Sequence, residues 1–423
     1  MTITPRRAAT TTRAARSRTR RRGAVGHGRH APAVRLHPRH AAEPQLALPE
    51  IAPPAPARGA YLGATVLRCA LYLGPLSVAV AAGGQLRQVA WPVPVVTLLL
   101  GWTAAQALTC AGVTVAQRAG IATACRLVAA GFAAVAGLWC ALVWIAPSAL
   151  LGPHRGLALV VGLGGLATLA TVTAALVTRA EAAVVRWCLP GWLLAVATLA
   201  ALAGRPVPWL PVSTLLPTAI VLALVRAFRP AMLPSCRKPF RLSRPELRRA
   251  GGYLVIGASQ AVCVGLLWRA GPSGSTMPFW LPLLLAVPVL EALIGWNTEA
   301  GADPAGRRGV TTVTIAGLLP PLAMGCSLAV AAYETDARDE VLGLAGGTLL
   351  GGVFAITFLL AARGRIGVAA VVASAPPLVT VLLKLLPTSA AGPLPNAVGA
   401  LAATHVAGLL VVALTAADLR RSS

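Results

Sequence analysis

The sequence of 423 residues contains 57% hydrophobic and only 12% charged residues, with a formal net charge of +25. Soluble domains carry about 25% charged residues, so this composition excludes an ordinary globular protein that must cover its surface with polar groups. Excess positive charge is also typical of nucleic-acid-binding proteins. Here the arginines lie in an N-terminal tail and between apolar segments, so we expect no nucleic-acid partner.

The N-terminal segment 1–58 mixes arginine with alanine, threonine, proline and histidine. It has too few apolar residues to form a core, so the sequence predicts a disordered tail. No apolar run follows the charges at signal-peptide distance, and we therefore expect the tail to stay in the cytoplasm. Its simplest role is to fix the topology. The alternative is binding to anionic lipid headgroups, to which each basic residue near the surface contributes roughly 1 kcal/mol.

From Ala60 onward, the chain contains apolar runs of about 20 residues, each long enough to cross a ~30 Å hydrocarbon layer as a helix. Barrel strands would alternate polar and apolar residues, whereas these runs are apolar on every face, so helices are predicted. The sequence thus predicts an all-α polytopic membrane protein in the lipid bilayer. About twelve transmembrane helices are expected at residues 60–84, 89–116, 121–146, 157–178, 184–204, 207–228, 251–268, 277–297, 309–333, 341–362, 367–387 and 396–417.

The charges between these spans indicate their orientation, because cytoplasmic connections carry the excess of lysine and arginine. The connections after the second, fourth, sixth, eighth and tenth spans are the more basic ones. The intervening connections carry single cations, namely Arg87, Arg155, Arg205, Arg269 and Arg338. The acidic segment 334–340 also falls on this second side. We therefore expect both termini in the cytoplasm of a bacterial cell, with the chain in its cytoplasmic membrane.

The longest connection divides the spans into six and six, because it is rich in proline and basic residues and suits an irregular linker. The sequence predicts an N-terminal six-helix bundle at 59–228, a basic cytoplasmic linker at 229–250 and a C-terminal six-helix bundle at 251–423. An even number of spans in each half makes the halves parallel, related by an axis along the membrane normal. The fold class is therefore a 6+6 parallel pseudo-repeat.

Polar residues inside membrane spans are costly, so they are functional candidates by default. Glu291 is the acid that lies well inside a predicted span, and Arg68 lies near the middle of the first span. Gln106 and Gln260 lie in the second and seventh spans. Two interpretations of Arg68 and Glu291 remain open. In the structural interpretation, they form an ion pair that locks the halves together, or Arg68 only extends toward the membrane interface. In the functional interpretation, Arg68 is a cationic point in a central cavity, with Glu291 as its counter-ion or as a carboxylate that binds a proton or a cation.

The sequence contains no Walker motif, no H-E-x-x-H and no G-x-S-x-G. Acid–base or metal catalysis would need groups that the apolar spans mostly lack. We therefore expect neither an enzyme nor a bound cofactor.

Three stretches are similar to a known superfamily. Residues 358–370 end one helix in an Ala-Arg-Gly-Arg turn and begin the next, 397–403 open the last helix, and 244–253 lead into the second half. They resemble the polysaccharide and lipid-linked-oligosaccharide flippases of the MATE-like exporter superfamily. The resemblance implies that the first, second, seventh and eighth spans line a cavity where arginines can meet a lipid-linked pyrophosphate. It also implies that the cavity contains Arg68, Gln106, Gln260 and Glu291.

The leading hypothesis is therefore a flippase-like exporter of a lipid-linked saccharide or another amphiphile, with enzymes of cell-surface glycan synthesis as its partners. One alternative is another twelve-span secondary carrier, such as a major-facilitator-type exporter. The acidic-basic motif expected after the second span of that family is missing, because residues 115–120 contain no aspartate. The other alternative is a membrane scaffold that does not transport and whose basic tail recruits cytosolic partners.

Overall fold

The structure is a computed structural model that describes residues 58–205, 210–233, 241–270, 280–302, 310–385 and 392–421. All of them belong to one compact unit, Pro56–Ser423. The tail predicted for residues 1–58 lies outside the described residues, except for Arg58.

The first half of the chain forms six long helices, each on one of the first six predicted spans. They are α1 (Arg58–Ala81), α3 (Pro92–Ala119), α4 (Ile121–Ile145), α6 (Arg155–Thr178), α7 (Glu181–Leu202) and α8 (Val212–Phe228). Two short helices, α2 (Gly83–Gln88) and α5 (Ser148–Leu151), lie in the connections before α3 and α6, and a 3₁₀ turn, η1 (Arg229–Met232), follows α8.

The second half forms the remaining six helices: α9 (Arg244–Ala270), α10 (Leu281–Ala302), α11 (Val310–Ala331), α12 (Arg338–Ala362), α13 (Ile366–Leu385) and α14 (Pro393–Arg421), with a 3₁₀ turn, η3 (Ala332–Glu334), after α11. Among the described residues, ten helices are long and apolar enough to cross a membrane, and α10 and α13 contain shorter apolar segments, Leu281–Asn297 and Ile366–Leu382. The described ranges contain no strand. The predicted all-helical, multi-pass membrane protein is thereby confirmed.

Helix α9 begins well before the predicted span at 251–268. The reason is local, because Glu246 accepts a hydrogen bond from the backbone N–H of Ser243 at 2.8 Å. Such a contact from the third helical residue back to the residue before the helix satisfies an N–H at the helix start. Hydropathy marks where the hydrocarbon begins, whereas this cap marks where the helix begins. The segment 234–240 of the predicted linker lies outside the described residues.

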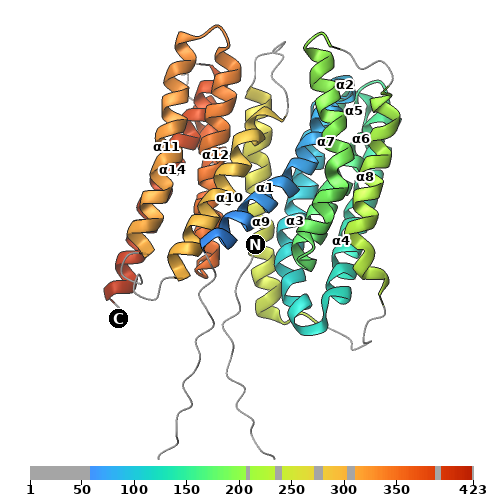
Figure 1. Ribbon diagram of the computed structural model, residues 1–423. Helices are drawn as coiled ribbons and strands as arrows, with labels where there is room; N and C mark the ends of the chain where they lie inside the picture. The colour runs from blue at the N-terminus through green and yellow to red at the C-terminus, as the bar shows by residue number, and fades with distance from the viewer. Residues whose placement is uncertain are drawn as a thin grey trace, which may run out of the picture. The chain divides into compact units, whose positions relative to one another are not determined.

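The two halves repeat one packing pattern. In the first half, α1 packs on α7, α3 on α4 and α6, α4 on α6, and α8 on α6 and α7. The corresponding helices of the second half make the same contacts: α9 with α13, α10 with α11 and α12, α11 with α12, and α14 with α12 and α13. Figure 1 shows α3, α4, α6, α7 and α8 in one group and α10, α11, α12 and α14 in another.

The contacts between the halves obey the same symmetry. Helix α3 packs on α9, and α1 packs on α10. An operation that exchanges the halves turns the first of these pairs into the second, as expected for a parallel duplication about one axis. The two pairs, here called the α3–α9 seam and the α1–α10 seam, join the halves.

Helix α12 is the most deeply buried span, and its glycines allow α10 and α14 to approach its backbone. A side-chain carbon on Gly347 would collide with the backbone carbonyl oxygen of Pro282 at the start of α10. The backbone there cannot move without displacing the helix, so this position requires glycine.

We expect Gly347→Ala to lower the free energy of unfolding by about 1–3 kcal/mol, the usual cost of overpacking a core. Gly399→Ala on α14 is the matched control, because a carbon there would meet no atom within 4 Å. That change should leave stability equal or slightly raise it, since glycine is the weaker helix former. Thermal unfolding of the two purified variants makes the comparison, and equal losses would contradict the close approach of α10 to α12.

Candidate functional site

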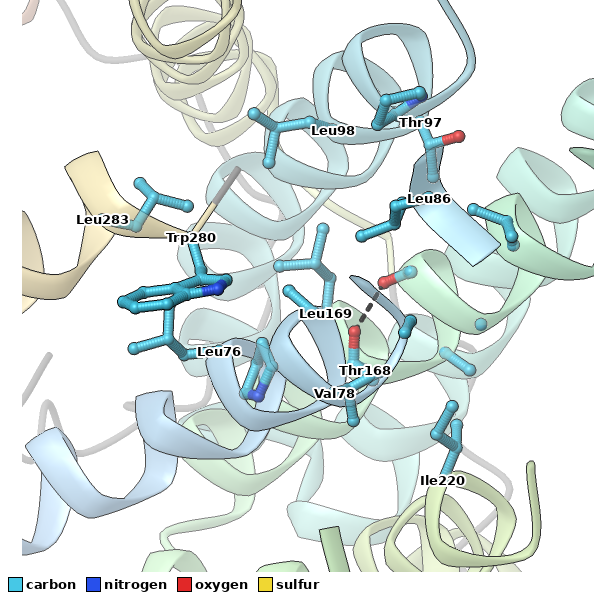
Figure 2. A pocket seen from close by; sticks show the side chains of 18 of the residues that line it. Leu76, Val78, Leu86, Thr97, Leu98, Thr168, Leu169, Ile220, Trp280 and Leu283 are labelled. Carbon is cyan, nitrogen blue, oxygen red and sulfur yellow. Dashed lines mark hydrogen bonds between the residues drawn. The ribbon is translucent and has the colours of Figure 1, made fainter. Parts of the chain in front are cut away.

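A cavity of about 600 Å³ lies against both halves. Its walls come from α1, α2, α3, α6 and α8 of the first half, and from α9, α10, the adjoining Trp280 and one residue of α12 in the second. Figure 2 shows side chains of α1, α2, α3, α6, α8 and α10 gathered around the cavity, with Trp280 and Leu283 on one side and Ile220 on the other.

The cavity occupies one end of the helices rather than their full length. Its lining comes mostly from the second half of α1 and of α9, and from the first half of α3, α6, α8 and α10, and it extends to Leu169 of α6 and Phe354 of α12 near the middle of these helices. These segments all converge on the end that the loop charges predict to face outside, here called the predicted outer end. The opposite, predicted inner end holds the α3–α9 and α1–α10 contacts described below.

The lining has two kinds of wall. Aromatic rings lie toward the seams, on Tyr72, Trp102, Trp268, Trp280 and Phe354. Aliphatic side chains lie where α1, α6 and α8 meet, among them Val78, Val160, Leu216, Ile220 and Val221. The hydroxyls of Thr97 and Thr168 donate to carbonyls of their own helices, those of Val93 and Gly165, so both are already satisfied. The described lining residues include no charged side chain.

The α3–α9 seam is closed along its whole length. At the predicted outer end, Val95 lies against Gly265, and the Arg269 guanidinium stacks on the Trp91 ring with 4.8 Å to its centroid. In the middle, a carbon on Gly257 would lie 2.9 Å from the Gln106 Cγ, so glycine lets α3 and α9 pack closely. At the predicted inner end, Arg118 of α3 forms an ion pair with Glu246 of α9.

The α1–α10 seam has close contacts in its inner part. Arg68 Nη1 lies 3.4 Å from Glu291 Oε2, and the two side chains are 12% and 3% exposed. One turn further inward, a carbon on Gly295 would lie 2.5 Å from the Thr65 Oγ1. Toward the predicted outer end, α1 and α10 both line the cavity instead. The two ion pairs seen in the described part of the chain therefore both join the halves on the inner side of the cavity.

Comparison with solved structures identifies this architecture. A multidrug resistance MATE family transporter of the MOP superfamily, in its outward-facing conformation, superposes with a TM-score of 0.56 at 13% identity, covering 86% of this chain and 97% of that one. This chain has the MATE-like fold. A MOP superfamily transporter from Pyrococcus furiosus, described as having a binding pocket of reverse polarity that suggests a different function, gives 0.53 at 12% identity over 86% of this chain and 96% of that one. No family model and no curated protein matches the sequence.

Within the MATE-like fold, the structure brings Arg68 and Glu291 together. Neither is among the lining residues, but their neighbours Cys69 and Leu290 are. The ion pair therefore lies beside the inner end of the cavity rather than on its wall. An ion pair that joins the halves and a cavity cation with its counter-ion both place these two side chains in contact.

Gln260 lies behind the aromatic wall and is 5% exposed. Its Oε1 accepts a hydrogen bond from the Trp102 Nε1 at 2.9 Å, and its Nε2 donates to the Thr357 Oγ1 at 3.1 Å. Gln260 thus holds a cavity-lining ring of the first half against two helices of the second. Gln106 lies in the α3–α9 seam against Gly257 and does not line the cavity.

The MATE-like cavity includes the four spans that the family resemblance implied, now α1, α3, α9 and α10. It also includes α6 and α8, which the sequence did not single out. The tryptophans of the aromatic wall were missed as well. Trp268 and Trp280 lie near one membrane face, but tryptophan is enriched at that depth in membrane proteins generally, so this signal does not identify a site. Trp102 lies in the middle of its span.

Proposed function

We propose that this chain is a secondary transporter of an amphiphile, working as an exporter or flippase in the cytoplasmic membrane with both termini inside. A lipid-linked saccharide is one candidate substrate, and it would place the protein beside the enzymes of cell-surface glycan synthesis. The observation that carries the proposal is the cavity shared by both halves, lined at the predicted outer end and closed toward the predicted inner end by two symmetry-related seams.

The repeated architecture supports alternating access. Two similar halves that touch at equivalent helix pairs can rock against each other around a site between them, so that contacts at one end form while those at the other end separate. In the present arrangement the contacts at the inner end include Arg68–Glu291 and Arg118–Glu246. Opening the inner end would separate these charges. Arg68 would then face a cavity open to the cytoplasm, where it could attract an anionic headgroup while Glu291 takes a proton or cation.

The alternatives differ in what supports them. Another type of secondary carrier would also work by alternating access of two similar halves, but the fold of this chain is similar to that of MATE-type structures. A scaffold would need the apolar helices but has no use for a chamber that both halves line.

Labelling of Cys69, which lines the cavity, tests the proposal directly. Of the eight cysteines, only Cys69 is kept. A membrane-impermeant thiol reagent is then applied to whole cells and to inside-out vesicles. Alternating access predicts labelling from both sides, because the same thiol faces each side in turn.

A variant that keeps only Cys125 is the matched control, because this cysteine is fully buried in the core of the first half. It should react from neither side. Labelling of Cys69 from one side only would refute alternating access and favour the scaffold.

A further inference from the structure

Cavity size limits what the site can hold. Small-molecule sites span about 300–1,000 Å³, and the 600 Å³ of this cavity lies within that range. The chamber therefore suits a drug-sized molecule or a single hydrocarbon chain.

Part of the aliphatic wall is not covered by other protein groups. Val160 of α6 and Val221 of α8 line the cavity and are 59% and 53% exposed. Leu73 of α1 and Leu284 of α10 also line it and are 43% and 37% exposed. An apolar chain seated among α1, α6 and α8 would cover the aliphatic side of this surface, which favours a ligand with a hydrocarbon tail.

Three arginines lie within two positions of lining residues at the predicted outer end, and these arginines are here called the rim of the cavity. Arg87 follows the lining residue Leu86, Arg155 precedes the lining residue Leu157 by two positions, and Arg269 follows the lining residue Trp268. All three are exposed. Arg269 stacks on Trp91, whereas Arg87 and Arg155 form no ion pair with any described residue.

Negative charge at this end of the molecule lies elsewhere. The acids at this end lie in the connection from α11 to α12 and in the first turn of α12. They are Glu334, Asp336, Asp339 and Glu340. Among the described lining residues, α11 contributes none and α12 contributes Phe354 alone. An uncharged chamber below a rim of one sign concentrates ions of the opposite sign and repels ions of its own.

From these observations we infer that the site takes a drug-sized anionic amphiphile with one hydrocarbon chain, whose chain lies among α1, α6 and α8 and whose anionic head meets Arg87 and Arg155. This inference rests on the proposed function and specifies the chemistry of its substrate. The rim would repel permanent cations, and the described lining residues offer no carboxylate to balance their charge.

Three probes with the same twelve-carbon chain and different heads test the inference: dodecyl sulfate, dodecyl glucoside and dodecyltrimethylammonium. The full-length protein that keeps only Cys69 is placed in zwitterionic nanodiscs and treated with an uncharged thiol reagent. Each probe is added below its micelle concentration, and the concentration that half-protects Cys69 is measured. The sulfate should protect at a concentration about tenfold or more below that of the trimethylammonium, with the glucoside between them.

The double change Arg87→Gln and Arg155→Gln should bring the three concentrations together and leave the glucoside value unchanged. Arg338→Gln is the matched control, because Arg338 is exposed at the same end but stacks on Tyr333 at 4.3 Å, beside the acidic segment. It should keep the full preference. High salt should weaken the preference of the parent protein, since exposed charges are screened.

Equal protection by the three heads, stronger protection by the cation, or an unchanged preference in the double variant would overturn the inference. So would an absence of protection by any probe. These results leave the two-sided labelling of Cys69 untouched, so they are distinguishable from failure of the proposed function, which shows as labelling from one side only.

Discussion

Replacing Glu291 with glutamine is expected to shift the protein away from the state that is closed at the predicted inner end. The carboxylate is 3% exposed and lies 3.4 Å from the Arg68 guanidinium. Removing one member of a buried ion pair typically costs about 3–5 kcal/mol, because the other charge stays in a poorly solvated site. Separating α1 from α10 would give Arg68 access to water. The inward-open state therefore becomes more stable relative to the outward-open state.

Labelling of Cys69 in inside-out vesicles should therefore rise in Glu291→Gln and in Arg68→Ala, while labelling from outside falls. The double change Arg68→Gln with Glu291→Gln removes both charges together. Its effect on stability should be smaller than the sum of the single changes, and the difference measures the coupling of the pair. The exchanged pair, Arg68→Glu with Glu291→Arg, should restore part of the outward preference.

Arg118→Gln is the matched comparison at the other seam. The Arg118 side chain is 58% exposed, and ion pairs of this kind contribute about 0–1 kcal/mol. Its effect on labelling should thus be much smaller than that of Glu291→Gln. Equal effects of the two changes, or no shift in labelling for Glu291→Gln, would show that the Arg68–Glu291 contact does not hold the inner end closed.

Filling the cavity is expected to abolish access without unfolding the protein. Gly164 of α6 lines the chamber, and a carbon added there would lie 3.6 Å from the Ile220 Cδ1, an ordinary contact. The first atom of a new side chain therefore fits, and an indole in Gly164→Trp must extend into the open volume. We expect the variant to reduce both the labelling of Cys69 and the binding of dodecyl sulfate by more than about tenfold, since the ring removes much of the space that buries the ligand.

Gly137→Trp on α4 introduces the same side chain where a carbon meets no atom within 4 Å and the backbone is exposed. It should leave labelling and binding unchanged. Thermal unfolding of both variants checks that the fold survives. Full access to Cys69 in a well-folded Gly164→Trp protein would mean that the chamber between α1, α6 and α8 is not on the route to this thiol.

Sequence reasoning located the helices well because hydrocarbon imposes a strong rule. An apolar run of sufficient length must satisfy its own backbone, and this fixes a helix whatever its neighbours are. Each predicted span therefore coincides with one helix. Arg68 and Glu291 were found by the same logic, since an ionisable side chain is conspicuous in apolar surroundings. The contact between them joins positions 223 residues apart, which no pattern within one span reveals.

The residues that line the cavity were not predictable, because apolar residues occur both inside and on the surface of a membrane protein. In a soluble protein a core residue is apolar and a surface residue polar, so the pattern separates the two. In a membrane the lipid-facing surface is as apolar as the interior. Val160 and Val221 therefore look the same in the sequence whether they face lipid, a neighbouring helix or an empty chamber. The positions of α6 and α8 at the site follow only from how the helices pack.

The two seams are related by symmetry but are closed to different extents. Helices α3 and α9 touch from Trp91–Arg269 to Arg118–Glu246, whereas the close contacts of α1 with α10 lie around Thr65 and Arg68. The α3–α9 seam thus has close contacts at both ends, whereas the α1–α10 seam has them only in its inner part. Toward the predicted outer end, the cavity-lining parts of α1 and α10 therefore offer a hydrocarbon tail a sideways route into the bilayer.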